Sequence, residues 1–157
     1  MASSVYVETT IVSYLTARPS RDLVQRAHQQ LTQRWWRTRR LQFDLYVSPP
    51  VIQEAAGGEP LRAQKRLAAL KAIPVLDATP AAMQLATALV APGAIPEPAA
   101  VDAAHIAIAT VHGLDYLLTW NCAHIANATI RNSIESICRA AGYEPPIPCT
   151  PEELMED

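Results

Sequence analysis

The sequence has few cysteines, no long apolar run and no excess of positive charge. Cys122, Cys138 and Cys149 are odd in number and show no CxxC spacing, which argues against a disulfide framework and a cysteine zinc site. No apolar run approaches about 18 residues, and the N-terminus lacks a charged segment followed by an apolar one. We therefore expect a protein of the reducing cytoplasm that has neither an export signal nor a membrane span.

The charge balance limits how the chain can bind polyanions. Its 13 Lys and Arg residues and 15 Asp and Glu residues give a formal net charge of −2. No overall basic field is present that would by itself indicate nucleic-acid binding. Any nucleic acid must therefore be held by a local site.

Strand-like segments alternate with helical patterns along the 157 residues. This alternation predicts an α/β fold with a mainly parallel sheet of about five strands flanked by helices. No repeat, low-complexity tract or long linker interrupts it, so we expect one domain over residues 1–157. The expected strands are 4–7, 44–48, 73–76, 115–119 and, more weakly, 146–149.

The helices are delimited by caps and apolar periodicity. Leu23, Ala27, Leu31 and Trp35 recur every four residues and predict one buried stripe. Serine or threonine followed by proline opens two helices, and glycine closes several. The expected helices are 21–40, Pro49 to Gly57, from Pro80 onward, 98–112 with Gly113 as its cap, and 124–141, and TPEE at 150–153 predicts a last helical turn.

Four oxygen-bearing side chains are expected at the same edge of the sheet. Glu8 follows the first strand, Glu54 lies in the helix after the second, Asp102 precedes the fourth expected strand, and Asn121 follows it. Ligands of open parallel sheets bind at the carboxyl ends of the strands. Clustered carboxylates repel one another unless a cation neutralises them, and oxygen ligands suit Mg²⁺ or Mn²⁺. Glu8, Glu54 and Asp102 are therefore candidate metal ligands.

Each of these residues also has an ordinary structural interpretation. Glu8 and Glu54 could be surface charges, and Asp102 could simply favour the helix dipole. Asparagine is more often a turn residue than a ligand, which applies to Asn121. A zinc site is a further alternative, without a recognised spacing, that would use His105, His112, His124 and Cys122.

Longer segments carry a resemblance to a known family. VYVETTIVSYL, YVSPPVIQEA, DAAHIAIATVHGLDYLLTWN and YEPPIPCTPEEL together resemble the PIN-domain ribonucleases of the VapC toxin type, over nearly the whole chain. The resemblance implies a PIN fold and an acidic pocket that binds Mg²⁺ or Mn²⁺ and cleaves RNA, leaving a 5′-phosphate and a 3′-hydroxyl. It also implies a small cognate antitoxin and a homodimer, with residues 21–40 and 60–71 as possible surfaces.

The resemblance also assigns site residues. Glu8, Glu54, Asp102 and Asn121 match the four acidic positions of the family, in the same order. The hydroxyl after the first acid corresponds to Thr9 or Thr10. Thr119 precedes the fourth position, and His105 is expected at the pocket wall, one helical turn after Asp102.

Two departures from the family pattern bear on activity. Glu8 replaces a commoner aspartate, and the neutral Asn121 stands where many relatives carry an aspartate. A second metal should therefore bind more weakly. The alternative function is a catalytically weak PIN-like module that binds RNA or protein.

One further segment could contact RNA or a second subunit. Trp35 is expected to be a core residue, whereas Trp36, Arg37, Arg39 and Arg40 combine an aromatic ring with positive charge. Such combinations suit single-stranded RNA. The charged residues of 61–71 are expected to be a solvated helix face.

Overall fold

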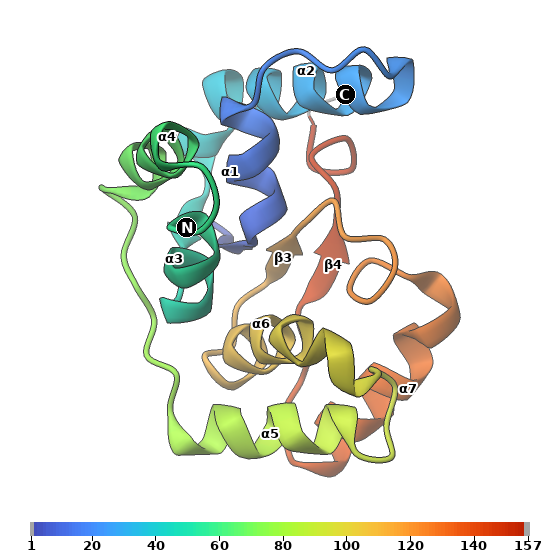
Figure 1. The fold of residues 1–157 in the computed structure, drawn as a ribbon. Coiled ribbons are helices and arrows are strands. Elements are labelled where there is room, and N and C mark those ends of the chain that lie inside the picture. Colours follow the sequence, from blue (N-terminus) through green and yellow to red (C-terminus); the bar gives the residue numbers. More distant parts are fainter. Residues whose placement is uncertain (1, 156–157) are drawn as a thin grey trace.

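The computed structural model describes residues 2–155 and contains a four-stranded parallel sheet with the order β2-β1-β3-β4. Helices surround this sheet (Figure 1). The strands are β1 (Ser4–Val7), β2 (Asp44–Tyr46), β3 (Tyr116–Leu118) and β4 (Ile147–Cys149). The α-helices are α1 (Thr9–Thr16), α2 (Leu23–Thr38), α3 (Pro49–Ala55), α4 (Pro60–Leu70), α5 (Pro80–Val90), α6 (Ala100–Val111) and α7 (Ala128–Ala140), and short 3₁₀ helices span Arg40–Gln42 and Glu97–Ala99.

The strand pairing brings the ends of β1 and β3 together. Val7 pairs with Leu118, and the N–H of Glu8 then donates to the carbonyl of Leu118 at 3.0 Å. On the other side of β3, the N–H of Thr119 donates to the carbonyl of Cys149 at 2.9 Å. The hydrogen-bond ladder therefore continues one residue past each strand and fixes Glu8 and Thr119 at the carboxyl edge of the sheet.

The expected strand at 73–76 is the one part of the sheet prediction that is wrong. Val75 forms a single parallel bridge with Val47, next to β2. The N–H of Val47 donates to the carbonyl of Pro74, and the N–H of Leu76 donates to the carbonyl of Val47. Proline has no N–H, so Pro74 cannot extend this pairing toward the start of β2. The sheet therefore has four strands, with this bridge at its edge.

The helices form two groups. Figure 1 shows α1, α3 and α4 together on one side, with α2 lying across the end of α1, while α5, α6 and α7 are grouped at the opposite end. The core runs between the sheet and both groups. Tyr6, Trp35, Leu89, Ile108 and Leu118 are among its largest fully buried side chains.

Helix α1 begins directly after β1, where the sequence patterns predict no helix. Four β-branched residues open it, in the sequence TTIV, and such residues have modest helix propensity. Glu8 is its N-cap and accepts a hydrogen bond from the N–H of Thr10. A carboxylate at this position satisfies a free donor and also favours the helix dipole. This cap and the burial of Ile11 and Val12 outweigh the modest propensity.

The predicted buried stripe of α2 is largely wrong. Trp35 is fully buried, but Leu23 is 84% exposed and Ala27 is also exposed. The face turned inward instead carries Gln29 and Thr32, which form hydrogen bonds with the 18–20 loop, with the carbonyl of His28 and with Trp120. Polar interactions therefore set the rotation of this helix.

Most of the remaining boundaries agree with the sequence patterns, but the helix predicted from residue 124 begins at Ala128. Gly113 follows α6 with φ of +72°, a conformation that favours glycine. The segment after β3 forms turns before α7 begins at Ala128. The chain after Cys149 forms a turn at 151–154 in place of a helix, with Glu153 accepting a hydrogen bond from the N–H of Thr150. Over residues 2–155, no helix is long and apolar enough to cross a bilayer.

Candidate metal centre

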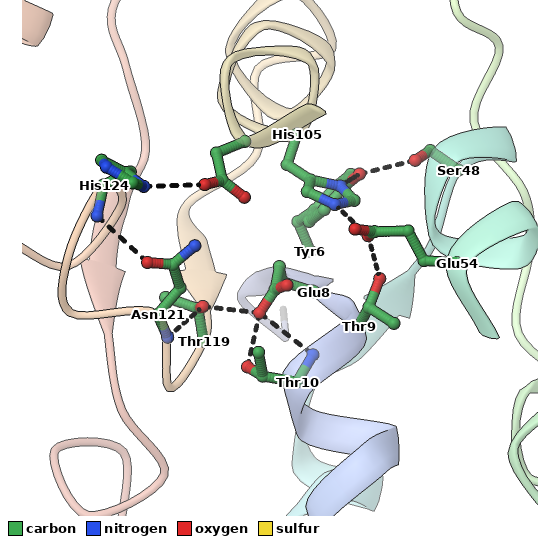
Figure 2. Close-up of polar contacts among 11 residues, drawn as sticks. Tyr6, Glu8, Thr9, Thr10, Ser48, Glu54, His105, Thr119, Asn121 and His124 are labelled. Atoms are coloured by element: carbon green, nitrogen blue, oxygen red, sulfur yellow. Dashed lines mark hydrogen bonds and ion pairs between the residues drawn. The ribbon is translucent and has the colours of Figure 1, made fainter. Parts of the chain in front are cut away.

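Glu8 lies at the centre of a polar cluster at the carboxyl edge of the sheet, and its side chain is buried (Figure 2). Its Oε1 accepts hydrogen bonds from the N–H of Thr10 at 3.1 Å, from the hydroxyl of Thr10, and from the hydroxyl of Thr119 at 2.6 Å. Within residues 2–155 no hydrogen bond reaches Oε2. Three donors therefore fix one carboxylate oxygen and leave the other available.

Glu54 projects toward the same cluster from α3. Its Oε1 accepts from the hydroxyl of Thr9 at 2.6 Å and is 2.7 Å from Nε2 of His105 (Figure 2). Its side chain is 38% exposed, and no donor among the described residues reaches its Oε2. The two glutamates are thus held in the same way, each by one oxygen. The consecutive Thr9 and Thr10 each orient a different carboxylate.

A buried polar chain stands behind Glu54. His105 comes from α6 and is fully buried. Its Nδ1 lies 2.6 Å from the hydroxyl of Tyr6, which lies 2.5 Å from the hydroxyl of Ser48. Tyr6 and Ser48 are also fully buried. Four side chains from β1, α3, α6 and the segment before α3 therefore form one continuous line from Ser48 to Glu54 (Figure 2).

The pKa values of the two carboxyl groups are shifted in opposite directions. Burial raises the pKa of Glu8, and the hydrogen bonds from Thr10 and Thr119 offset this only in part. Burial also acts to raise the pKa of Glu54, but hydrogen bonds from His105 and Thr9 outweigh it and lower the pKa. Glu54 is therefore a stable carboxylate, whereas the charge of Glu8 is poorly compensated by the protein alone.

The donor set fits a divalent cation. Glu8, Glu54 and His105 each present a potential ligand atom, and these atoms lie within 4.8 Å of one another. Opposite ligands of an octahedral Mg²⁺ lie about 4.2 Å apart, so small side-chain movements would bring the group around one ion. Carboxylate oxygens are the ligands that Mg²⁺ and Mn²⁺ prefer. A cation would also compensate the buried charge of Glu8.

Asp102, the third candidate ligand, has a different neighbour. It lies in the first turn of α6, and its Oδ2 is 3.1 Å from Nδ1 of His124. Both side chains are partly exposed. Asp102 does not belong to the three-residue group of Glu8, Glu54 and His105. The structure thus brings two of the three candidate ligands together with His105 and pairs the third with His124.

Asn121 orders the loop that follows β3. Its Oδ1 accepts hydrogen bonds from the N–H of Ala123 at 3.2 Å and of His124 at 3.0 Å. Its own N–H donates to the hydroxyl of Thr119. Through Thr119 it connects to Glu8 (Figure 2). Asn121 therefore lies beside the cluster, with its amide oxygen engaged in a turn.

The alternative zinc site of three histidines and a cysteine does not form. His105 faces the glutamates, whereas His112 contacts the carbonyl of Asp77 and Cys122 is exposed. Within residues 2–155, Glu8, Glu54 and His105 are the one group of histidine, cysteine and acidic side chains close enough to share an ion. This zinc alternative is therefore excluded, because its four residues have different neighbours.

Tyr6 and Ser48 belong to the cluster, although the sequence patterns did not identify them as site residues. Tyr6 lies inside β1, where an aromatic residue is typical of a core. Ser48 precedes α3 and was expected to cap it, but its side chain forms no capping hydrogen bond. Its hydroxyl contacts Tyr6, 42 residues away in the chain. No local pattern indicates a contact over that separation.

Comparison with known proteins supports the fold. No family model matches the sequence, and no curated protein matches it. Among solved structures, the chain is similar to the crystal structure of VapBC2 from Rickettsia felis bound to a DNA fragment from their promoter. The TM-score is 0.54 at 14% sequence identity, over 94% of this chain and 98% of the other. The chain therefore has a PIN-like fold.

The parallel order of the sheet explains why Glu8 and Glu54 meet, although they are 46 positions apart in the sequence. β1 is a central strand and β2 is its parallel neighbour, so the loops after both strands leave the sheet at the same edge. At 14% identity the similarity concerns the fold, and the roles of single residues rest on the contacts described above.

Proposed function

We propose that this chain is a single-domain, Mg²⁺- or Mn²⁺-dependent ribonuclease of the PIN type that acts as the toxin of a toxin–antitoxin pair. The observation that carries the proposal is the pair Glu8 and Glu54. Each carboxylate is oriented through one oxygen and leaves the other available, at the carboxyl edge of a PIN sheet. Such a site suits a hard cation and a phosphate ligand.

Glu8, Glu54 and Asp102 are the proposed metal ligands, directly or through water. When bound, the ion would supply positive charge at the scissile phosphate and lower the pKa of water. The available oxygens of Glu8 and Glu54 would accept hydrogen bonds from the attacking water and orient it. Thr9, Thr10 and Thr119 hold these carboxylates in place, and His105 helps to keep Glu54 ionised.

The reaction is hydrolysis of an RNA phosphodiester. The water oxygen forms a bond to phosphorus while the bond from phosphorus to the 3′ oxygen breaks. The water loses a proton, and the 3′ oxygen takes one up. The products carry a 5′-phosphate and a 3′-hydroxyl.

The proposal includes partners and a setting. The similar structure is VapBC2 bound to promoter DNA, which supports a small cognate antitoxin for this chain. Exposed Leu23 and Val24 on α2 and Leu61 on α4 support a subunit or antitoxin surface there, and light scattering would test the proposed homodimer. We propose a cytoplasmic setting, which the three free cysteines support.

A basic aromatic segment near the end of α2 is less available for RNA than its sequence indicates. Arg39 lies over the ring of Phe43 and donates to the carbonyl of Leu154. Arg40 lies over the ring of Trp36. Arg37 is the exposed cation that remains for RNA on this segment.

The second candidate function is a PIN-like binding module with little catalytic power. Two observations favour it: the amide oxygen of Asn121 is already engaged by backbone donors, and Asp102 lies outside the three-residue group. This candidate retains the fold and the partner surface but predicts no metal-dependent cleavage.

A cleavage assay separates the two candidates. Purified protein is incubated with a panel of single-stranded RNAs in Mg²⁺, Mn²⁺ or EDTA, beside Asp102→Asn and the control Glu97→Gln. Glu97 is an exposed acid just before α6. We expect metal-dependent cleavage by the wild type and by Glu97→Gln, and a loss of about 100-fold or more in Asp102→Asn, because a ligand charge is removed. If the wild type neither cleaves RNA nor binds Mn²⁺, the ribonuclease proposal fails and the binding module is the supported function.

A further inference from the structure

Ser48 occupies a helix N-cap but directs its hydroxyl elsewhere. An N-cap serine usually accepts a hydrogen bond from the second or third residue of its helix. In α3 the first two residues are Pro49 and Pro50, so the second residue has no N–H and one of the two usual backbone donors is missing. The Ser48 hydroxyl instead lies 2.5 Å from that of Tyr6, in a fully buried position. The local sequence thus releases Ser48 for a contact with the site.

Ser48, Tyr6, His105 and Glu54 form a line of hydrogen bonds, and the direction of these bonds follows from the Glu54 end. Oε1 of Glu54 already accepts a hydrogen bond from the hydroxyl of Thr9 at 2.6 Å, and a carboxylate oxygen can only accept. Nε2 of His105, at 2.7 Å, must therefore carry a proton and donate it. In a neutral imidazole, Nδ1 is then a bare acceptor.

The Ser48 end of this line of hydrogen bonds supplies the donor that a bare Nδ1 of His105 requires. Among the described residues, the buried Ser48 hydroxyl has one hydrogen-bond partner, so its proton is donated to Tyr6. The Tyr6 hydroxyl can donate to Nδ1 of His105 at 2.6 Å and accept from Ser48. Every polar atom in this buried line then has a partner of the correct type.

We propose that Tyr6 and Ser48 are positioning residues that hold His105 as a neutral imidazole protonated at Nε2, so that His105 orients Glu54 and is itself kept from ligating the metal. The proposal rests on the proposed function only for the presence of the metal. It assigns His105 to the hydrogen-bond shell around the ion, although its Nε2 lies within 4.8 Å of the potential ligand oxygens of Glu8 and Glu54.

A reversed chain is the competing arrangement. If Nδ1 donated to Tyr6, and Tyr6 donated to Ser48, then Nε2 would be bare and could ligate the ion directly. The two arrangements use the same atoms and differ only in where the protons lie. They predict opposite tautomers of His105 and opposite effects on metal binding when the Tyr6 hydroxyl is removed.

Nitrogen NMR of the metal-free protein distinguishes them. The ¹⁵N signals of His105 are identified by single replacements of the three other histidines, His28→Gln, His112→Gln and His124→Gln, which leave His105 intact. At mildly alkaline pH we expect a bare Nδ1 and a protonated Nε2 in His105. Protonation at Nδ1, whether alone or with Nε2, would overturn the proposal.

Metal affinity gives a second measurement. Tyr6→Phe and Ser48→Ala each remove one hydroxyl, and Tyr116→Phe is the control because Tyr116 lies at the start of β3, away from the site. With Mn²⁺ as the probe, we expect Tyr6→Phe to bind about 10- to 100-fold more weakly, as for other residues that orient metal ligands. Ser48→Ala should show a smaller loss, Ser48→Thr should restore part of it, and Tyr116→Phe should bind as the wild type does.

The outcomes separate this inference from the proposed function. If Tyr6→Phe binds Mn²⁺ as tightly as the wild type or more tightly, with a bare Nε2, then His105 is a ligand and the inference fails while the metal site stands. If the wild type binds no Mn²⁺, the proposed function fails, and the tautomer of His105 is still decided by the NMR measurement.

Discussion

The two sides of the acidic pocket are built in different ways. On one side, Glu8 and Glu54 are held by threonine hydroxyls and by a buried chain that ends at Ser48. On the other side, Asp102 has one partner, the partly exposed His124, and Asn121 orders a loop. The first side is fixed by a helix cap and buried side chains before any ion binds, whereas the second depends on a turn-rich segment.

This difference indicates that the two sides of the pocket contribute to metal binding in different ways. Preorganised ligands lower the cost of binding because their rotamers are already set. A less constrained side can adjust to an ion and to a phosphate after they arrive. We therefore expect substitutions in the buried chain of Ser48, Tyr6 and His105 to reduce both stability and metal binding, and substitutions on the Asn121 side to have smaller effects on stability.

The largest contrast is expected between the two histidines. His105→Gln should destabilise the protein by about 2–4 kcal/mol, because it disrupts a fully buried hydrogen-bond network. His124→Gln, at a side chain that is 35% exposed, should change stability by no more than about 0.5 kcal/mol. Urea denaturation of both variants measures the difference. Equal losses would contradict the division between the two sides.

Replacing Glu8 by glutamine should have an intermediate effect on stability, and it should make the metal-free protein more stable. Glutamine keeps the acceptor for Thr10 and Thr119 but carries no charge to bury. Glu8→Gln should raise the free energy of unfolding and the Tm of the metal-free protein at neutral pH. Thermal melts in EDTA would measure it.

The stability difference between Glu8→Gln and the wild type should depend on pH. Since the folded pKa of Glu8 is raised, its protonated form favours folding. That contribution is complete below the ordinary value of 4.5 and is lost as the pH rises through the raised value. The advantage of Glu8→Gln over the wild type should therefore grow with pH across this window and then level off. An advantage that is the same at every pH would argue against a buried, uncompensated carboxylate.

The smallest effects are expected at Asn121. Asn121→Ala removes the acceptor for two backbone N–H groups and should cost about 0.5–1 kcal/mol. Asn121→Asp keeps the acceptor and adds a negative charge near the pocket. It should leave stability within about 0.5 kcal/mol and increase Mn²⁺ affinity several-fold. An unchanged Mn²⁺ affinity would place Asn121 outside the influence of the ion.

Much of the fold could be predicted because its signals are local. The four strands that form the sheet all lie within predicted segments, and proline and glycine mark most helix ends. The failures concern tertiary interactions. Helix α1 depends on capping by Glu8, and the rotation of α2 is set by the contacts of Gln29 and Thr32 with distant residues.

The candidate site shows the same limit. The positions of Glu8 and Glu54 follow from the parallel order of β1 and β2, which sequence patterns can indicate. The contacts of Tyr6 with Ser48 and His105 join residues 42 and 99 positions apart. Such contacts depend on side-chain packing and have no periodic signal in the sequence.

The most direct test of the account is calorimetric titration of Mn²⁺ into the metal-free wild type, Glu8→Gln and Glu97→Gln. The acidic pocket predicts saturable binding to the wild type and to Glu97→Gln, and binding that is lost or strongly weakened in Glu8→Gln. Absence of binding to the wild type, or equal binding to all three proteins, would contradict a metal centre at Glu8 and Glu54.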